Sequence, residues 1–275
     1  MRLLTHAIDK YRQDGITDLL LSGYRYIGLK RWVDNQRGYQ KLSVGNITAK
    51  FGYTNRVEWE STWKRSNTET RILLDILSEI HPTDIFFDIG ANTDLYTCFI
   101  GRKLSSGVVH AFEPYPPNVE QLKWNIELNG VNAEVWPNAV SNEEASVQFD
   151  WPEESEIGYG EASISVDETK AHEVRSISID HRISQGALPT PDVIKIDVEG
   201  GEPLVLRGMM QTLQTSSPRL LYCEFHIESN DTRPAIHGFG ATEDELVSKI
   251  QDAGYDAIKL EDADRRVFYK FEATE

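Results

Sequence analysis

A carboxylate followed by small residues stands where a short apolar run of the chain ends. Asp88 closes this run, and Gly90, Ala91 and Asn92 follow it before a predicted helix that starts near residue 95. Small residues ahead of a helix N-terminus leave backbone amides open, so a ligand can approach them closely. The dinucleotide fingerprint needs three glycines and this loop has one, so the pattern disfavours a dinucleotide-dependent oxidoreductase.

A second carboxylate has a comparable place in the sequence. Glu113 directly follows the apolar run 108–112, lies 25 residues after Asp88, and precedes Pro114. A carboxylate at the end of a neighbouring strand is suited to bind the hydroxyls of a ribose. The alternative is that Glu113 only favours the start of the next helix through its charge. The ribose role is the preferred interpretation.

Strands and helices alternate around these carboxylates. Strands are predicted at 85–87, 108–112, 135–140, 193–196 and 220–224, helices at 95–104, 116–128, 203–213 and 242–254, and a hairpin at 255–271. This alternation predicts an α/β fold with a parallel sheet and helices on both of its faces. Residues 141–180 depart from the pattern and predict short, partly antiparallel strands.

Several ordered motifs resemble the FkbM-type methyltransferases, which use S-adenosylmethionine. They are residues 84–130, Asn138-Ala139-Val140-Ser141, residues 193–202, Leu206-Arg-Gly208 and Cys223-Glu224-Phe-His226. The resemblance therefore covers about residues 84–226. It implies the Rossmann-like seven-stranded methyltransferase sheet, in which the final hairpin contributes one antiparallel strand.

The resemblance also implies which residues contact the cofactor. They are Asp88, Gly90, Ala91 and Asn92 at the methionine part, Glu113 at the ribose, and Pro114, Asn138 and Ala139 near the adenine. Asp94 departs from the family, which usually has glycine there. Its carboxylate could repel the carboxylate of the cofactor or pair with its ammonium group. A protein that binds the cofactor without turnover therefore stays open as an alternative.

The cofactor determines what the protein has to add. A sulfonium methyl is already electrophilic, so the protein aligns an acceptor and removes a proton when the acceptor is a hydroxyl. Candidate residues stand at the carboxyl ends of predicted strands, the usual ligand side of open α/β sheets. They are Asp197, Glu199, Glu224 and His226, with Asp197 the first choice. Such residues could bind Mg²⁺, but their spacing matches no metal motif, so no metal is predicted.

The predicted function is O-methylation of a sugar hydroxyl or carboxylate in a glycan or a lipid-linked saccharide. The alternative within the same chemistry is a small secondary metabolite as acceptor. Residues 1–68 are predicted to form an accessory segment ahead of the methyltransferase domain, residues 69–275. Within it, 16–33 predict an amphipathic helix that packs on the main domain or lies at a membrane surface. Residues 39–65 predict a small β element.

The charge of the chain is uneven. The net charge is −16; residues 1–80 hold 13 Lys and Arg against 9 Asp and Glu, and the remainder holds 15 against 35. An acidic main body disfavours a nucleic-acid partner, and such acidity also fits a halophilic source.

Length and composition narrow the class further. The 2 cysteines give neither a disulfide framework nor a zinc cluster. The sequence shows neither a spanning apolar stretch nor a secretory signal. A cytoplasmic protein is therefore expected, with a location at the inner membrane surface and a homo-oligomer both left open.

Overall fold

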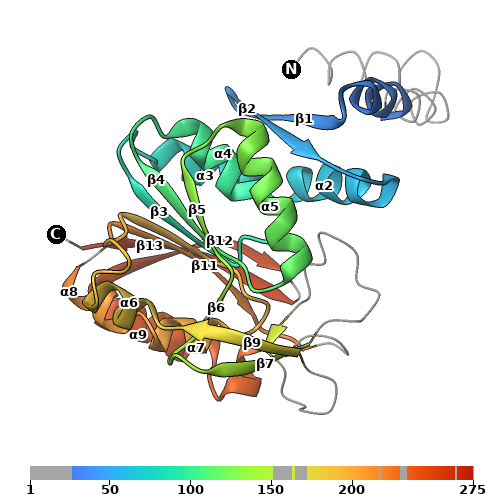
Figure 1. Cartoon of the computed structure of the whole chain (residues 1–275). Coiled ribbons are helices and arrows are strands. Elements are labelled where there is room, and N and C mark those ends of the chain that lie inside the picture. Colours follow the sequence, from blue (N-terminus) through green and yellow to red (C-terminus); the bar gives the residue numbers. More distant parts are fainter. Residues whose placement is uncertain are drawn as a thin grey trace, which may run out of the picture.

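A seven-stranded sheet forms the centre of the computed structural model (Figure 1). The structure describes residues 27–93, 95–150, 163–164, 172–216, 218–229, 234–263 and 265–274. In order across the sheet, the strands are β12 (Tyr255–Ala263), β13 (Arg266–Ala273), β11 (Leu220–His226), β10 (Val193–Ile196), β3 (Ile85–Ile89), β4 (Val108–Phe112) and β5 (Ala133–Trp136). β13 is antiparallel to both of its neighbours, and the other six strands of this sheet all run in one direction. The Rossmann-like seven-stranded sheet with its final hairpin is thereby confirmed.

Helices cover both faces of the sheet (Figure 1). One face carries α3 (Thr70–Glu79), α4 (Leu95–Lys103) and α5 (Pro116–Asn129), and the other carries α6 (Ile179–Ser184), α7 (Glu202–Arg207), α8 (Met210–Thr215) and α9 (Glu243–Asp252). Side chains alternate along a strand, so β3 serves both layers. Phe86 packs with the first set of helices and Phe87 with the second. The predicted two-sided covering is confirmed.

The prediction of one strand over 135–140 is wrong. The main sheet ends at β5, and β6 (Ala139–Val140) belongs to a separate sheet. The chain turns between them, where the Asn138 amide donates to the Trp136 carbonyl at 2.8 Å. Pro137 has no amide hydrogen, so it cannot continue the ladder. The turn directs Asn138 and Ala139 toward the edge of the main sheet.

The helix predicted at 203–213 is interrupted and forms α7 and α8. The break lies at Gly208, whose carbonyl accepts hydrogen bonds from Ser178 Oγ at 2.9 Å and from the Asp180 amide at 2.9 Å. A side chain at position 208 would stand 2.0 Å from the Ser141 carbonyl oxygen. Tertiary contacts with the preceding segments therefore end the first helix.

A smaller sheet lies beside the main one. Its strand order is β6, β9 (His172–Ile177), β7 (Ser146–Asp150) and β8 (Ser163–Ile164). β7 is antiparallel to both of its neighbours, and β6 is parallel to β9. The short, partly antiparallel strands expected in 141–180 are confirmed. The acidic residues 152–161 lie outside the described part of the chain.

The N-terminal β element is a hairpin, β1 (Tyr39–Val44) and β2 (Ile47–Gly52), followed by α2 (Arg56–Thr68). Amide side chains of α5 bind the backbone of β2: Asn125 Oδ1 accepts from the Gly52 amide at 2.7 Å, and Asn129 Oδ1 from the Lys50 amide at 2.8 Å. The hairpin also shares an apolar cluster with α3 and α4. These contacts hold α2 beside the carboxyl end of β3.

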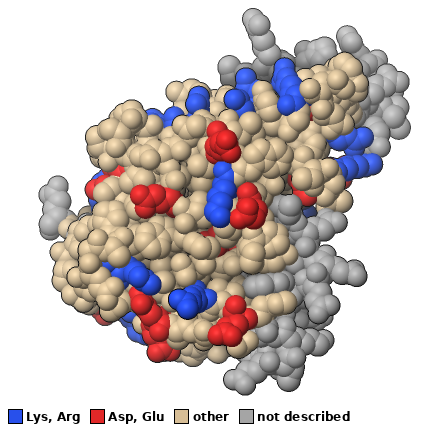
Figure 2. Space-filling model, viewed as in Figure 1, with Lys and Arg blue, Asp and Glu red and all other residues tan. Residues whose placement is uncertain are grey.

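Residues 27–37 are helical and precede the hairpin. The larger part of the predicted amphipathic helix, 16–26, lies outside the described residues, so its packing and its membrane contact stay predictions. None of the described helices combines the length and the apolarity that crossing a bilayer requires. Figure 2 shows basic side chains along the upper edge, where the N-terminal elements lie, and acidic and basic side chains mixed below. This distribution matches the uneven charge of the sequence.

Candidate active site

One cavity of about 220 Å³ opens at the carboxyl ends of β3, β4, β10 and β11. Most residues singled out in the sequence line it: Gly90, Ala91, Asn92, Glu113, Pro114, Asn138, Ala139, Asp197, Glu199, Glu224 and His226. Two do not appear in this lining. Asp88 lies beneath the cavity, and Asp94 lies outside the described residues. The structure therefore brings both predicted sets, cofactor-binding and catalytic, to one place.

Glu113 joins two loops at the cavity. Its carboxylate accepts hydrogen bonds from the Asn92 amide at 2.9 Å and from the Tyr115 amide at 2.8 Å. Burial raises the pKa of Glu113 to about 7, although these hydrogen bonds oppose the shift. Glu113 thus orients the loop after β3 while facing the cavity itself. The bond to Tyr115 also fits the alternative role near the start of α5, so both interpretations describe part of its surroundings.

Gly90 permits a close approach of two strand ends. Its φ of +79° is in the left-handed region, and a Cβ there would stand 1.8 Å from the Asp197 carbonyl oxygen. The Gly90 and Ala91 amides both donate to the Phe112 carbonyl, at 3.0 Å each. The loop after β3 is therefore fixed between β4 and β10.

Asp88 was expected to contact a ligand, but it does not line the cavity. Its side chain is fully buried and accepts a hydrogen bond from Thr97 Oγ1 at 2.7 Å. Lys195 Nζ lies 3.5 Å from Asp88 and 3.5 Å from Asp197, and donates to the Gly90 carbonyl at 3.0 Å. Asp88 therefore acts on the cavity through Lys195, which holds both the loop and Asp197.

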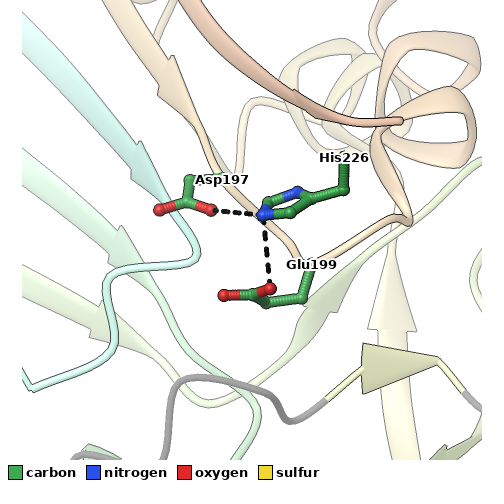
Figure 3. Close-up of side chains that lie close together, drawn as sticks. All are labelled: Asp197, Glu199 and His226. Atoms are coloured by element: carbon green, nitrogen blue, oxygen red, sulfur yellow. Dashed lines mark ion pairs between the residues drawn. The ribbon is translucent and has the colours of Figure 1, made fainter. Parts of the chain in front are cut away.

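His226 lies at the centre of a carboxylate cluster (Figure 3). Its Nε2 is 3.2 Å from Glu199, 3.6 Å from Glu224 and 4.0 Å from Asp197. Its Nδ1 is 2.9 Å from Oε1 of Glu202, which is fully buried. His226 comes from the end of β11, Asp197 and Glu199 from the loop after β10, and Glu202 from the first residue of α7.

The charges of this cluster shift its protonation. Burial lowers the pKa of His226, but the neighbouring carboxylates, with Glu202 first, outweigh it and raise that pKa to about 10. Burial and the Asp197 charge raise the pKa of Glu224. For Asp197, the positive charges of Lys195 and His226 outweigh burial and lower the pKa. The cluster therefore favours a charged His226 and an ionised Asp197, whereas it favours the protonated form of Glu224.

Several residues that line the cavity were not among the site residues predicted from the sequence. Arg65 reaches the cavity from α2, with Nη1 3.2 Å from Thr93 Oγ1, although it belongs to the predicted accessory segment. Arg266 comes from β13 and binds Glu224 at 2.9 Å. Lys195 could have been predicted from the sequence, because it lies inside the apolar run 193–196 and a buried charge needs a partner. Long-range packing alone brings the two arginines here.

Two known proteins are similar to this chain in sequence. The chain is 29% identical to the hexuronic acid methyltransferase AglP of Haloferax volcanii, over 54% of this chain and 59% of that protein. It is 26% identical to Methyltransferase 1 of Beauveria bassiana, over 46% of this chain and 59% of that protein. The chain thus spans less than two thirds of the length of either relative.

A structural comparison pairs the chain with the FkbM methyltransferase of Methylobacillus flagellatus KT. The identity is 14%, the TM-score is 0.46, and the match covers 69% of this chain and 44% of that one. The family profile described as the methyltransferase FkbM domain matches residues 88–257, a span that contains the loop after β3, Glu113 and the cluster around His226. The chain therefore belongs to the FkbM methyltransferase family.

Proposed function

We propose that this protein transfers the methyl group of S-adenosylmethionine to a hydroxyl or carboxylate of a saccharide, with a hexuronic acid as the preferred acceptor. One observation carries the proposal: the loop 90–92, Glu113 and the carboxylate cluster around His226 line a single cavity. S-adenosylmethionine supplies a methyl group on a positively charged sulfur, which is electrophilic without further activation. The name of the Haloferax volcanii relative supports the hexuronic acid.

The residues at the cavity fit this cofactor. A side chain at position 90 would meet the Asp197 carbonyl, so Gly90 lets the loop after β3 pack against the end of β10 at the cavity wall. Glu113 has a buried carboxylate at the cavity wall, where it would accept hydrogen bonds from ribose hydroxyls. Asn138 and Ala139 would lie beside the adenine. Each of these roles follows the family pattern at matching positions.

The carboxylate cluster would receive the acceptor. Asp197 and Glu199 both line the cavity and are partly accessible, with side chains 27% and 20% exposed. A sugar carboxylate is ionised at neutral pH and needs no base, so the protein has only to position it. A sugar hydroxyl has to lose a proton, and Asp197 is the first choice to accept it.

Transfer of labelled methyl groups tests this proposal. The purified chain is incubated with S-adenosylmethionine tritiated in the methyl group and with a glucuronoside or the matching glucoside. We expect label in the glucuronoside, released by mild alkali as a methyl ester is, and none in the glucoside. Label in neither sugar, with cofactor binding seen by calorimetry, would reject this acceptor. Absence of cofactor binding as well would reject methyl transfer.

Cofactor binding should strengthen as the pH rises through about 7. Burial raises the pKa of Glu113 to about 7, so its carboxylate is protonated below that pH and ionised above it. If the ionised form accepts from the ribose, Kd should rise by about tenfold for each pH unit below 7. Calorimetry between about pH 5.5 and 8.5 measures this slope, and Glu113→Gln should remove it. A slope that persists in Glu113→Gln would assign the titration to another group.

Arg65 is expected to bind the carboxylate of the methionine part. Its guanidinium bonds Thr93 next to the cofactor loop, and no carboxylate of the described residues lies within ion-pair distance of it. Arg65→Ala should raise the Kd for S-adenosylmethionine by about tenfold, the effect of one partly exposed charged contact. The Kd for methylthioadenosine, which lacks that carboxylate, should not change.

Arg56→Ala is the matched control for this substitution. Arg56 lies on the same helix, α2, and pairs with Glu60 at the surface at 2.6 Å. It should leave both ligands unaffected. An equal loss of both ligands in Arg65→Ala would show that the substitution distorts the loop instead of removing a carboxylate contact.

A further inference from the structure

Three side chains at the cavity have the chemistry and the spacing of a metal site. Asp197, Glu199 and His226 each offer one ligand atom, and these atoms all lie within 4.8 Å of one another (Figure 3). In the sequence, Asp197 and Glu199 are separated from His226 by a helix pair and a strand, so the three residues form no metal-binding motif of recognisable spacing. The parallel pairing of β10 with β11 brings them together.

The orientation of His226 is a second, independent observation. Oε1 of Glu202, itself fully buried, lies 2.9 Å from Nδ1 and also accepts a hydrogen bond from the Gly200 amide at 3.0 Å. With a proton held on Nδ1, Nε2 is the ring nitrogen that lies near Asp197 and Glu199, and a cation bound there would take the place of the Nε2 proton. Metal-binding histidines almost always donate their other ring nitrogen to a carboxylate or carbonyl in this way. Glu202 thus has the place relative to His226 that the outer partner of a metal-binding histidine takes.

Four carboxylates, those of Asp197, Glu199, Glu202 and Glu224, lie within 4.0 Å of a ring nitrogen of His226. Lys195 pairs with Asp197 through Oδ2, whereas the oxygen of Asp197 nearest His226 is Oδ1. Arg266 binds Glu224 at 2.9 Å. A divalent cation between Asp197, Glu199 and His226 would be attracted by these carboxylates.

We propose that Asp197, Glu199 and His226 bind one divalent cation and that Glu202 orients His226 for it. Two carboxylate oxygens with one imidazole nitrogen suit Mn²⁺ better than Ca²⁺ or Mg²⁺, which prefer oxygen alone. Three protein ligands leave coordination positions open, and Asp197 and Glu199 line the cavity. The open positions can take oxygens of the acceptor sugar, a step that rests on the proposed function, whereas cation binding itself does not.

Titration with Mn²⁺ alone tests the site. The full chain is first treated with EDTA and dialysed, and free Mn²⁺ is then followed by electron paramagnetic resonance. We expect one Mn²⁺ per chain that survives moderate salt. Glu199→Gln should weaken its binding by more than about tenfold through loss of a charged ligand, and Glu202→Gln by about 10-fold to 100-fold through loss of the outer carboxylate.

Glu228→Gln is the matched control, because Glu228 is exposed just beyond β11 and outside the cluster. It should leave the single Mn²⁺ in place, whereas non-specific binding to the acidic surface would respond equally to Glu228→Gln and Glu199→Gln. Equal losses in the two variants, or no bound Mn²⁺ in the wild type, would overturn the proposal.

Two further measurements show whether a loss of Mn²⁺ binding comes from misfolding and whether the proposed function fails together with the metal site. The thermal midpoint of unfolding should rise with Mn²⁺ for the wild type and not for Glu199→Gln, whose midpoint without metal shows whether it folds. Binding of S-adenosylmethionine by the EDTA-treated chain is measured by calorimetry. Retained cofactor binding without Mn²⁺ binding would refute the metal site and leave methyl transfer standing.

Discussion

Replacing Glu113 with alanine is expected to weaken the binding of S-adenosylmethionine by about 100-fold while the chain stays folded. A ribose would lose two hydrogen bonds to a charged acceptor, each contributing about 1.5 kcal/mol. Every 1.4 kcal/mol or so corresponds to a factor of about ten in Kd. Calorimetry with the wild type and the variant at about pH 8, where Glu113 is ionised, measures the difference.

Glu113→Ala also removes the acceptor of the Asn92 and Tyr115 amides. Each buried amide left without a partner costs about 1–3 kcal/mol, so the variant needs a check of its thermal midpoint. Glu113→Gln keeps the shape and one oxygen acceptor, and it should show a smaller loss, of about tenfold. Both variants should also bind methylthioadenosine more weakly than the wild type does, because methylthioadenosine carries the same ribose. Unchanged affinity in a folded Glu113→Ala protein would contradict the ribose role.

The sequence was most informative where an element is continuous and buried. The predicted strands 108–112 and 193–196 coincide with β4 and β10, because strands covered on both faces are mostly apolar; only His110 and Lys195 interrupt these two runs. Pro116 and Gly130 correctly marked the ends of α5; the αL cap of that helix has φ +59°. The rule that parallel strands present ligands at their carboxyl ends then placed Glu113 and His226 at one cavity.

The sequence was least informative where a side chain is placed by a distant element. Arg65 reaches the cavity only because Asn125 and Asn129 of α5 hold the preceding hairpin. No local sequence pattern near Arg65 predicts that contact. Similarly, the break at Gly208 follows from contacts with the segment around Ser178. Periodicity describes one segment at a time, so it misses such contacts.

For Asp88, the sequence predicted the position in the strand but not the direction of the side chain. Its position at a strand end suggested a ligand contact, but the direction of its side chain depends on register. Asp88 pairs with Lys195 across β3 and β10, and in-register neighbours of parallel strands point to the same face of the sheet. Aligning the two runs would have indicated this pair, since each charge needs the other when both are buried.

Lys195→Met is accordingly expected to destabilise the fold by about 3–5 kcal/mol, as removal of one partner from a buried ion pair does. Lys195 is 2% exposed and Asp88 is fully buried, so the substitution leaves the Asp88 carboxylate without its cation. The Gly90 carbonyl loses a donor at the same time. Urea unfolding followed by tryptophan fluorescence measures the change in the free energy of unfolding.

A double substitution separates the charge from the packing of the lysine chain. Asp88→Asn combined with Lys195→Met removes both buried charges, and it should recover more than half of the stability lost in Lys195→Met alone. Asp197 keeps its charge in both proteins but is 27% exposed and remains hydrated. Lys259→Met, at an exposed ion pair with Asp262, should cost less than about 1 kcal/mol. If the double variant were as unstable as Lys195→Met, lost packing rather than the unpaired Asp88 charge would be the cause, and Asp88 would no longer act through Lys195.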